Sequence, residues 1–383
     1  MKGSLQRELD SFYKEVSGGD FNIRELTKGA FSQARGKLNP TAFVELSDNA
    51  LSTFYNEAPY WTWYGMRLLA VDGSRLVLPK HHTIVEEFGE HSFGPHGDSP
   101  RSLAMCSLLY DPMNLITVDA QLAPYASSER ELLSRHLPKV QSGDLLLLDR
   151  GYPSIALMFE LLAKGIQFCM RMKDDWWLAI KDFAESDQKE GLVVFQLPKK
   201  DYGLLETYPE AAREITCRLI SIDLPNGEKE ILCSSLNDME AYPYKDFAEL
   251  YHFRWNIEEG YKLLKARAEV ENFSGKTARA VKQDFYAKIF ATNLCAILAF
   301  PVEEKVRAEY DQEKIKHRHK INRTSALAMT SNISIALFLN RTIDQAIEAF
   351  DNLVSKTKEI IRPNRHIERK KRPKRPFHMN YKR

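Results

Sequence analysis

Short apolar runs alternate with amphipathic segments along most of the chain, a pattern typical of a mixed α/β protein. The apolar runs predict strands, and segments with apolar residues three or four positions apart predict helices. We expect strands at 66–72, 75–79, 102–110, 114–122, 144–149, 166–171, 192–197, 214–223 and 229–234. We expect helices at 4–17, 24–37, 40–56, 128–139, 153–164, 246–267, 279–300 and 324–352.

The order of these elements predicts a core flanked by helical regions and interrupted by a strand-rich segment. The expected parts are a helical N-terminal region at 1–63, the first part of the core at 64–173, a β-rich insertion at 174–245, a helix and core completion at 246–300, a C-terminal helical region at 301–360 and a basic tail at 361–383. The fold class is therefore expected to be α/β, with a mixed sheet.

Two aspartates stand where an expected buried strand ends. Asp72 follows the apolar run 68–71, with Gly73–Ser74 predicting a turn, and Asp149 ends the apolar run at 144–149. A carboxylate at the end of a buried strand costs free energy unless it is paired or binds a metal. Taken alone, either aspartate is better explained as a turn or helix-capping residue. Together with a third acid, they suggest one site.

The third acid is Glu258, in the most informative segment of the chain. This segment carries Tyr251, Arg254, Glu258, Lys262 and Lys265, at successive intervals of three, four, four and three residues. On one helix, these intervals bring all five side chains to the same face. A carboxylate among cations can hold a divalent metal beside bound phosphates. The ordinary alternative is a solvated amphipathic helix with internal salt bridges.

Other acids compete for these positions. Glu259 lies about 100° around the helix from its neighbour, so the register with the cations favours Glu258. Asp174 and Asp175 lie in a polar stretch, so we expect them at the surface. Asp119 also ends an apolar run, but nothing around it suggests metal or phosphate binding, and we expect a structural role.

The spacing Tyr-x2-Arg-x3-Glu-x6-Lys, combined with the two strand aspartates and the Asp-Arg-Gly-Tyr turn at 149–152, resembles bacterial insertion-sequence transposases of the DDE type, insertion-sequence family four. The resemblance covers roughly residues 25–383. It implies a ribonuclease-H-like core interrupted by the β-rich insertion. It further implies that Asp72, Asp149 and Glu258 form the catalytic, metal-binding triad.

In that family the triad holds two Mg²⁺ ions, which Mn²⁺ can replace, and the helix residues handle the DNA end. The matching residues here are Tyr251, Arg254 and Lys265, with Arg150, Lys173 and Lys262 as further DNA contacts. The implied function is cleavage of double-stranded DNA at terminal inverted repeats and joining of the 3′ ends to target DNA. Because two ends must be paired, we expect a homodimer. The alternatives are a catalytically defective, DNA-binding remnant and a metal-dependent nuclease without strand transfer.

Composition is consistent with such a protein. The 383 residues are 44% hydrophobic and 28% charged, as in soluble globular proteins, and the formal net charge is +2. We find no run of about 18 apolar residues and no signal peptide, so we expect a cytoplasmic protein that is not in a membrane. The five cysteines form no Cys-x2-Cys pair and are expected to be reduced.

The last 23 residues, 361–383, carry ten Lys or Arg against one Glu. A run of this kind cannot bury a core. Its functional interpretation is an arm that binds phosphates without regard to sequence, and the alternative is a tail that only improves solubility.

Overall fold

The computed structural model describes residues 4–93, 99–224, 227–312, 317–339 and 341–361. Its helices are α1 (Leu5–Ser17), α2 (Lys28–Arg35), α3 (Thr41–Glu57), α4 (His82–Phe88), α5 (Glu129–His136), α6 (Ile155–Ala163), α7 (Leu178–Glu185), α8 (Gly203–Thr207), α9 (Phe247–Phe253), α10 (Asn256–Lys262), α11 (Ala278–Gln312), α12 (Arg323–Phe338) and α13 (Ile343–Lys356). The predicted basic tail lies outside the described residues except for Ile361.

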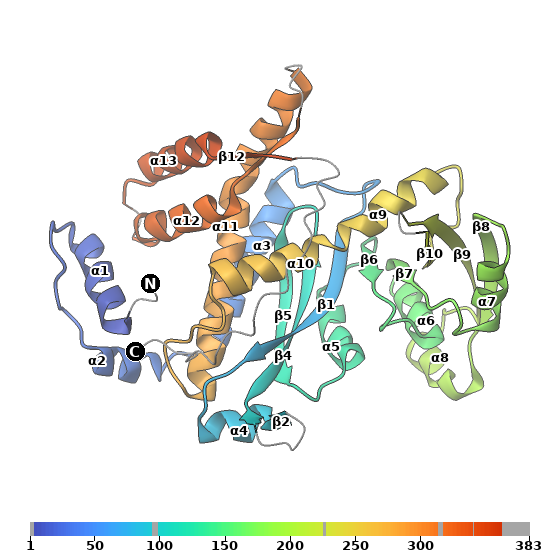
Figure 1. Ribbon diagram of the computed structural model, residues 1–383, viewed down its shortest axis with the longest axis horizontal. Coiled ribbons are helices and arrows are strands. Elements are labelled where there is room, and N and C mark those ends of the chain that lie inside the picture. The colour runs from blue at the N-terminus through green and yellow to red at the C-terminus, as the bar shows by residue number, and fades with distance from the viewer. Residues whose placement is uncertain (1–3, 94–98, 225–226, 313–316, 340, 362–383) are drawn as a thin grey trace. The chain divides into compact units, whose positions relative to one another are not determined.

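The strands are β1 (Leu68–Val77), β2 (His91–Phe93), β3 (Ser99–Arg101), β4 (Leu103–Asp111), β5 (Ile116–Pro124), β6 (Leu145–Leu148), β7 (Gln167–Arg171), β8 (Glu190–Gln196), β9 (Glu214–Asp223), β10 (Lys229–Ser234), β11 (His319–Ile321) and β12 (Lys358–Ile360). Within the described residues, eight of them form one sheet in the order β5-β4-β1-β6-β7-β10-β9-β8 (Figure 1). The fold is mixed α/β, as the sequence predicted.

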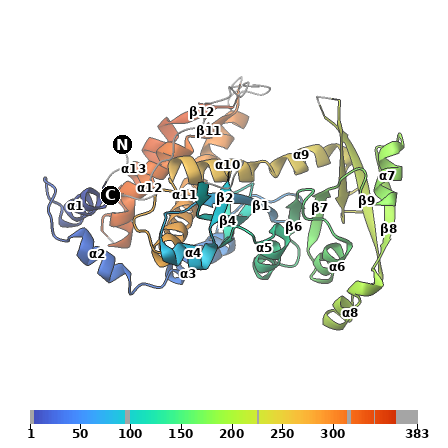
Figure 2. The same cartoon turned by 60° about the horizontal axis from the view of Figure 1, so that its bottom comes forward.

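The strands of the expected insertion continue this sheet. β1, β6 and β7 are parallel neighbours, and β10 pairs antiparallel with β7, followed by β9 and β8 (Figure 2). Helix α7 packs on β9 and β10. The β-rich segment therefore lengthens the sheet at the β7 edge.

The chain divides into two compact units. One consists of Met1–Ala58, Arg75–Ala104 and Tyr261–Arg383, and the other of Pro59–Ser74 and Met105–Gly260. The second unit contains both strand aspartates and the first three residues of the helix signature. The two lysines of that signature belong to the first unit.

The sheet brings the two aspartates to equivalent positions. In the parallel pair formed by β1 and β6, Leu68 lies opposite Leu145 and Ala70 opposite Leu147. Continuing this register by two residues puts Asp72 opposite Asp149. Because side chains alternate between the faces of a strand, both aspartates lie on the same face, on strands about 4.8 Å apart. The two apolar runs, 68–71 and 145–148, are fully buried and hold this register in the core.

Two strands predicted at 66–72 and 75–79 are in fact one, because β1 runs without a turn from Leu68 to Val77. Gly73 has another role. A Cβ at this position would lie 3.1 Å from Oε1 of Glu129 and 3.4 Å from the sulfur of Met105, so glycine allows close packing against the strand. Asp72 therefore lies inside a strand and not at its end.

The prediction of a single helix at 246–267 is also wrong, because this segment is divided into α9, α10 and a π-helical turn at Leu263–Arg267. At the break, the N–H groups of Arg254 and Trp255 donate to carbonyls three residues earlier. These tighter turns change the rotation of the chain, so the signature residues do not share one regular helix face. The helix predicted at 324–352 is likewise two helices, with Thr342 at a positive φ of 45° before α13.

Helix α11 is the core of the first unit and packs along α3. Phe54 and Phe300 meet edge to face with ring centroids 5.2 Å apart, and Asn293 donates to Ser47 over 2.9 Å. By length and composition alone, Ala278–Glu309 is apolar enough to cross a membrane, but half of its most apolar stretch is buried inside the structure. Core helices of soluble proteins have the same property.

A buried ion pair joins the starts of the two aspartate-bearing strands. Arg67, directly before β1, donates to both carboxylate oxygens of Asp144 over 3.0 and 2.6 Å. Both side chains are less than 10% exposed. Removing one partner would leave the other charge buried and unpaired.

We therefore expect Arg67→Met to lower the free energy of unfolding by about 3–5 kcal/mol. The control Arg135→Met removes an exposed pair with Glu131 on one helix turn and should change stability by less than about 0.5 kcal/mol. Urea unfolding followed by circular dichroism measures both. Equal, small losses would show that the buried pair does not hold these strands.

Candidate active site

Asp72 lies among other charged groups in the second unit. Its pKa is raised to about 6, chiefly by burial; the N–H of Gly73 and the positive charge of Arg254 lower the pKa, and the carboxylates of Glu129 and Asp149 raise it. The Gly73 N–H donates to Oδ1 over 2.9 Å. This carboxylate is therefore one that a cation would stabilise.

Asp149 directly follows β6 and opens a tight turn, in which the N–H of Tyr152 donates to the Asp149 carbonyl over 3.1 Å. Its Oδ1 atom is buried and has no hydrogen-bond partner among the described residues. Buried carboxylate oxygens are normally paired, because their desolvation is costly. An oxygen left in this state fits a metal ligand.

Glu129 is a neighbour that the sequence interpretation missed. It is the first residue of α5, and burial and the charge of Asp149 raise its pKa. The Ser-Ser-Glu-Arg-Glu pattern at 127–131 indicated only the start of a helix. No strand leads into Glu129, so local sequence gave no sign that it would lie beside the aspartates.

Arg254 and Tyr251 are buried beside the aspartates, at 4% and 1% exposure. The Arg254 guanidinium lies over the ring of Tyr251, 5.6 Å from its centroid, and its Nε has no hydrogen-bond partner among the described residues. Burial lowers the pKa of Arg254, but its interactions with Tyr251, Asp149 and Asp72 outweigh burial and raise it. Its positive charge therefore compensates the two aspartates.

The Tyr251 hydroxyl donates to the carbonyl of Leu148 over 3.4 Å. Leu148 is the last residue of β6, so this bond fixes α9 to the strand end that precedes Asp149. In this structure the tyrosine positions the backbone next to the site. The expectation that it contacts a DNA end stays a prediction.

Glu258 and Glu259 lie in α10, and they differ in exposure. Glu258 is half-buried, whereas Glu259 is exposed. Asn256 at the start of the helix is also half-buried, and its amide donates to the carbonyl of Pro112 over 3.0 Å. The choice of Glu258 over Glu259 stays a prediction. The groups that shift the pKa of Asp72 are Gly73, Arg254, Glu129 and Asp149, so the carboxylate that the structure brings to Asp72 from a helix is that of Glu129.

The further DNA contacts predicted in this unit, Arg150 and Lys173, are both exposed. The Lys173 amino group lies 5.2 Å from the ring centroid of Trp176, and the Arg130 guanidinium lies 5.7 Å from the same ring. An aromatic ring with two nearby cations offers contacts both to phosphates and to bases.

Lys262 and Lys265 belong to the first unit. Lys262 is exposed. The amino group of Lys265 donates to the carbonyl of Arg75 over 2.8 Å and lies 6.0 Å from the ring centroid of Tyr261. Their assignment as DNA contacts stays a prediction.

The rival acids behave as expected. Asp174 and Asp175 are exposed. Asp119 accepts a hydrogen bond from the buried ring of His136 over 2.6 Å, which gives it a structural role. The five cysteines, all among the described residues, are buried and form no disulfide, as predicted.

Metal binding can be tested against the donors present. Carboxylate oxygens are the ligands that Mg²⁺ and Mn²⁺ prefer. Asp72 and Asp149 offer such oxygens on one face of the sheet, and Oδ1 of Asp149 has no hydrogen-bond partner among the described residues. Among the described residues, however, no three His, Cys, Asp or Glu side chains are already arranged as a metal site. The two aspartates fit a divalent ion, and further ligands must move to complete its shell.

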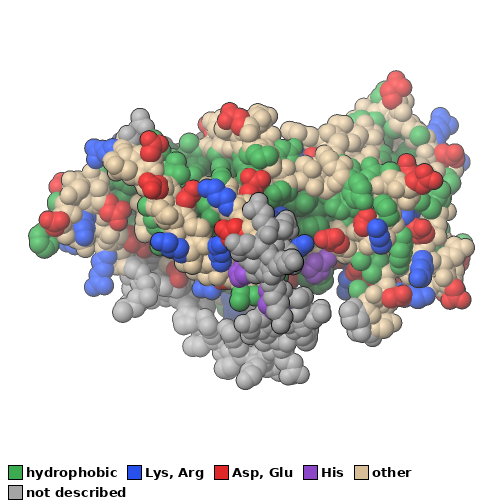
Figure 3. Space-filling model, turned by 90° about the horizontal axis from the view of Figure 1, so that it is seen from above, with side chains coloured by type: hydrophobic (Ala, Val, Ile, Leu, Met, Phe, Trp, Pro, Cys, Tyr) green, Lys and Arg blue, Asp and Glu red, His purple; other side chains and the backbone are tan. Residues whose placement is uncertain are grey.

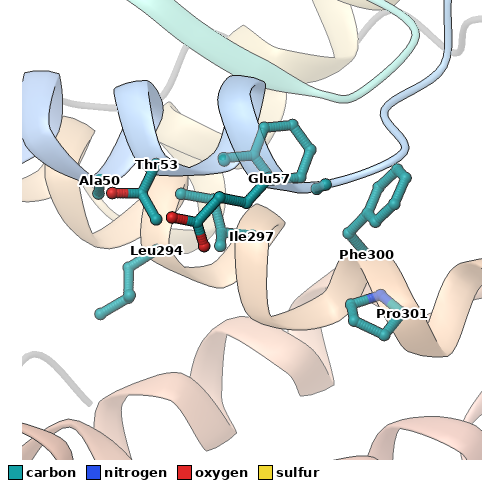
Figure 4. A pocket seen from close by; sticks show the side chains of 9 residues that line it. Ala50, Thr53, Glu57, Leu294, Ile297, Phe300 and Pro301 are labelled. Atoms are coloured by element: carbon teal, nitrogen blue, oxygen red, sulfur yellow. The ribbon is translucent and has the colours of Figure 1, made fainter.

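Neither the face shown in Figure 3 nor a pocket in the first unit points to a different site. On the face in Figure 3, acidic and basic side chains are interspersed. A pocket of about 440 Å³ in the first unit lies between α3 and α11 and is mainly apolar (Figure 4). Pro301, which lacks the N–H that would bond the preceding turn, lines it together with Phe54 and Leu294. Such a lining offers little to a phosphodiester.

The family described as "Transposase DDE domain" matches residues 63–294, more than half of the chain. The chain belongs to the DDE transposases. The matched span includes both strand aspartates, Glu129 and the whole helix signature.

Two insertion-sequence transposases are similar to this chain. Transposase InsG for insertion sequence element IS4, from Escherichia coli (strain K12), is 23% identical over 294 residues, which are 74% of this chain and 64% of that protein. The transposase for IS231E from Bacillus thuringiensis subsp. finitimus is 18% identical over 297 residues, 67% of this chain and 61% of that protein. The transposase thus spans less than two thirds of the length of these relatives.

Among solved structures, the piggyBac transposase synaptic complex with hairpin DNA is similar at a TM-score of 0.42 and 13% identity. The match covers 75% of this chain and 57% of that chain.

The raised pKa of Asp72 predicts how the stability of this transposase depends on pH. A pKa of about 6 in the folded state, against an ordinary 3.8, means that the folded protein binds this proton more tightly than the unfolded chain. The associated stability is complete below pH 4 and is lost as pH rises through 6. Without divalent ions, Asp72→Asn should therefore stabilise the protein by up to about 3 kcal/mol at pH 7 and by little at pH 4.

Urea unfolding at pH 4, 5, 6 and 7 in the presence of EDTA measures this difference. Asp119→Asn is the contrasting variant. Burial raises the pKa of Asp119, but the hydrogen bond and charge of His136 outweigh burial and lower it, so this variant should destabilise the protein at neutral pH. A constant effect of Asp72→Asn across the pH range would contradict the electrostatic account.

Proposed function

We propose that this protein is a DNA transposase that cleaves at the terminal inverted repeats of an insertion sequence and joins the freed 3′ ends to target DNA. The observation that carries the proposal is the parallel register of β1 and β6, which sets Asp72 and Asp149 side by side on one face of the sheet. Membership of the DDE transposase family supports it.

In this proposal, Asp72, Asp149 and Glu258 hold two Mg²⁺ ions, for which Mn²⁺ can substitute. When bound, such ions activate a water or a 3′-hydroxyl and stabilise the leaving oxygen of the phosphodiester. The buried guanidinium of Arg254 offsets part of the repulsion between the two aspartates before the ions arrive. Tyr251 holds the end of β6 in place through Leu148.

The positively charged residues position the DNA. Arg150 and Lys173 are exposed in the same unit as the aspartates, and each can neutralise one phosphate. Lys262 and Lys265 are assigned the same task on the strength of the Tyr-x2-Arg-x3-Glu-x6-Lys spacing. The partner is double-stranded DNA, both element ends and target, bound by a homodimer because two ends must be paired.

Cleavage of labelled duplex that carries the element's own terminal repeat tests this function. With Mg²⁺, we expect wild type to nick the repeat and to form joined products with target DNA. Glu258→Ala should reduce nicking at least about a hundredfold, because a ligand of the ions is lost. Glu259→Ala, which removes an exposed carboxylate on the neighbouring helix position, should keep nearly full activity.

Filter binding of the same duplex shows whether each variant still recognises DNA. Nicking without joined products would identify a metal-dependent nuclease. Binding without nicking by wild type would identify a catalytically defective remnant. Equal losses in the two glutamate variants would refute the assignment of Glu258.

A further inference from the structure

The start of α5 is fixed to the loop that follows Asp149. Ser128 caps the helix by accepting from the N–H of Glu131 over 3.2 Å. Arg130 donates to the carbonyls of Gly151 and Pro153 over 3.2 and 2.8 Å. Glu129 lies between these two residues, so its backbone is held against this loop.

Two glycines accommodate the Glu129 carboxylate. A Cβ at Gly73 would lie 3.1 Å from its Oε1, and a Cβ at Gly151 would lie 3.1 Å from its Oε2. Gly73 is the residue after Asp72, and Gly151 comes two residues after Asp149. The carboxylate thus lies between the two backbone segments that carry the aspartates, and the absence of side chains at both glycines makes room for it.

The hydroxyl of Tyr152 is a buried polar group beside the Glu129 carboxylate. Tyr152 is 1% exposed, and its hydroxyl has no hydrogen-bond partner among the described residues. The charged groups that act on it are Glu129, Asp72, Asp149 and Arg254, so it lies beside all three carboxylates. The Tyr152 hydroxyl and Oδ1 of Asp149 are thus two buried polar atoms without a hydrogen-bond partner among the described residues, and both lie near three carboxylates.

The charges do not balance without a further cation. The carboxylates of Asp72, Asp149 and Glu129 lie near one another and repel, and one buried guanidinium, that of Arg254, faces them. A divalent ion would remove this repulsion, and a water on such an ion would give the Tyr152 hydroxyl a partner.

We propose that Glu129 binds the divalent cation together with Asp72 and Asp149, as a fourth acidic residue beside the three of the DDE signature. The inference deepens the proposed function and rests on it, because it adds a residue to the same site. Since the described residues contain no ready-made three-ligand arrangement, binding requires the Glu129 side chain to turn toward the aspartates. A half-buried side chain at the first position of a helix is free enough to do so.

Titration calorimetry of the full chain with MnCl₂ tests the inference without DNA or activity. Glu129→Gln keeps the shape of the side chain and removes its charge, so we expect Mn²⁺ affinity to fall at least about tenfold. The control Glu131→Gln alters an exposed carboxylate on the same helix turn, paired with Arg135, and should stay within about twofold of wild type.

A second variant tests the geometry with Glu129 intact. Gly151→Ala puts a methyl group 3.1 Å from Oε2 and should also weaken Mn²⁺ binding, whereas Gly203→Ala, where nothing lies within 4 Å, should not. Thermal unfolding in EDTA shows that each variant folds. The Glu129→Gln midpoint should be no lower than that of wild type, because the substitution removes repulsion.

Unchanged Mn²⁺ affinity in folded Glu129→Gln would overturn the inference, and so would a wild type that binds no Mn²⁺. The first result leaves the proposed function intact if wild type still nicks the terminal repeat and Glu258→Ala does not. Failure of wild type to nick or join DNA, with Glu129-dependent Mn²⁺ binding retained, would instead overturn the proposed function alone.

Discussion

The parallel pairing of β1 with β6 is the constraint on which the site depends. Two fully buried apolar runs fix the register, and that register alone decides that Asp72 and Asp149 face the same way. A slip of one residue would turn one of the aspartates to the opposite face of the sheet. The Arg67–Asp144 pair at the start of both strands reinforces the same alignment from the other end. Hydrophobic burial therefore determines where the charges meet.

Placing carboxylates at this position has an electrostatic cost, and the surrounding structure offsets only part of it. Arg254, itself nearly inaccessible to solvent, supplies one positive charge, and Tyr251 attaches its helix to the end of β6. Burial raises the pKa of Asp72 more than the positive charge of Arg254 lowers it, so the compensation is incomplete. If the proposed cation binds here, relief of this electrostatic cost would add to its binding free energy.

Much of this arrangement could be predicted from the sequence, because burial and periodicity act locally. The runs before Asp72 and Asp149 predicted buried strands, and the strands at 214–223 and 229–234 are present with the predicted bounds. The turn expected at Gly73–Ser74 is absent, because glycine serves equally for a turn and for close approach of a neighbouring group. The break near Arg254 was likewise not visible, since no Gly or Pro marks it.

Glu129 shows where local sequence stops being informative. Its neighbours signal only a helix start, and its closeness to the aspartates follows from the sheet order and from the hydrogen bonds of Arg130 to the Gly151 loop. The clue is in the aspartate segments: each aspartate is followed within two residues by a glycine, and a Cβ at either glycine would meet the same carboxylate. A glycine next to a functional residue can therefore mark the approach of a distant side chain. Here that approach brings a negative charge to a place that already holds two, and a bound cation would offset their repulsion.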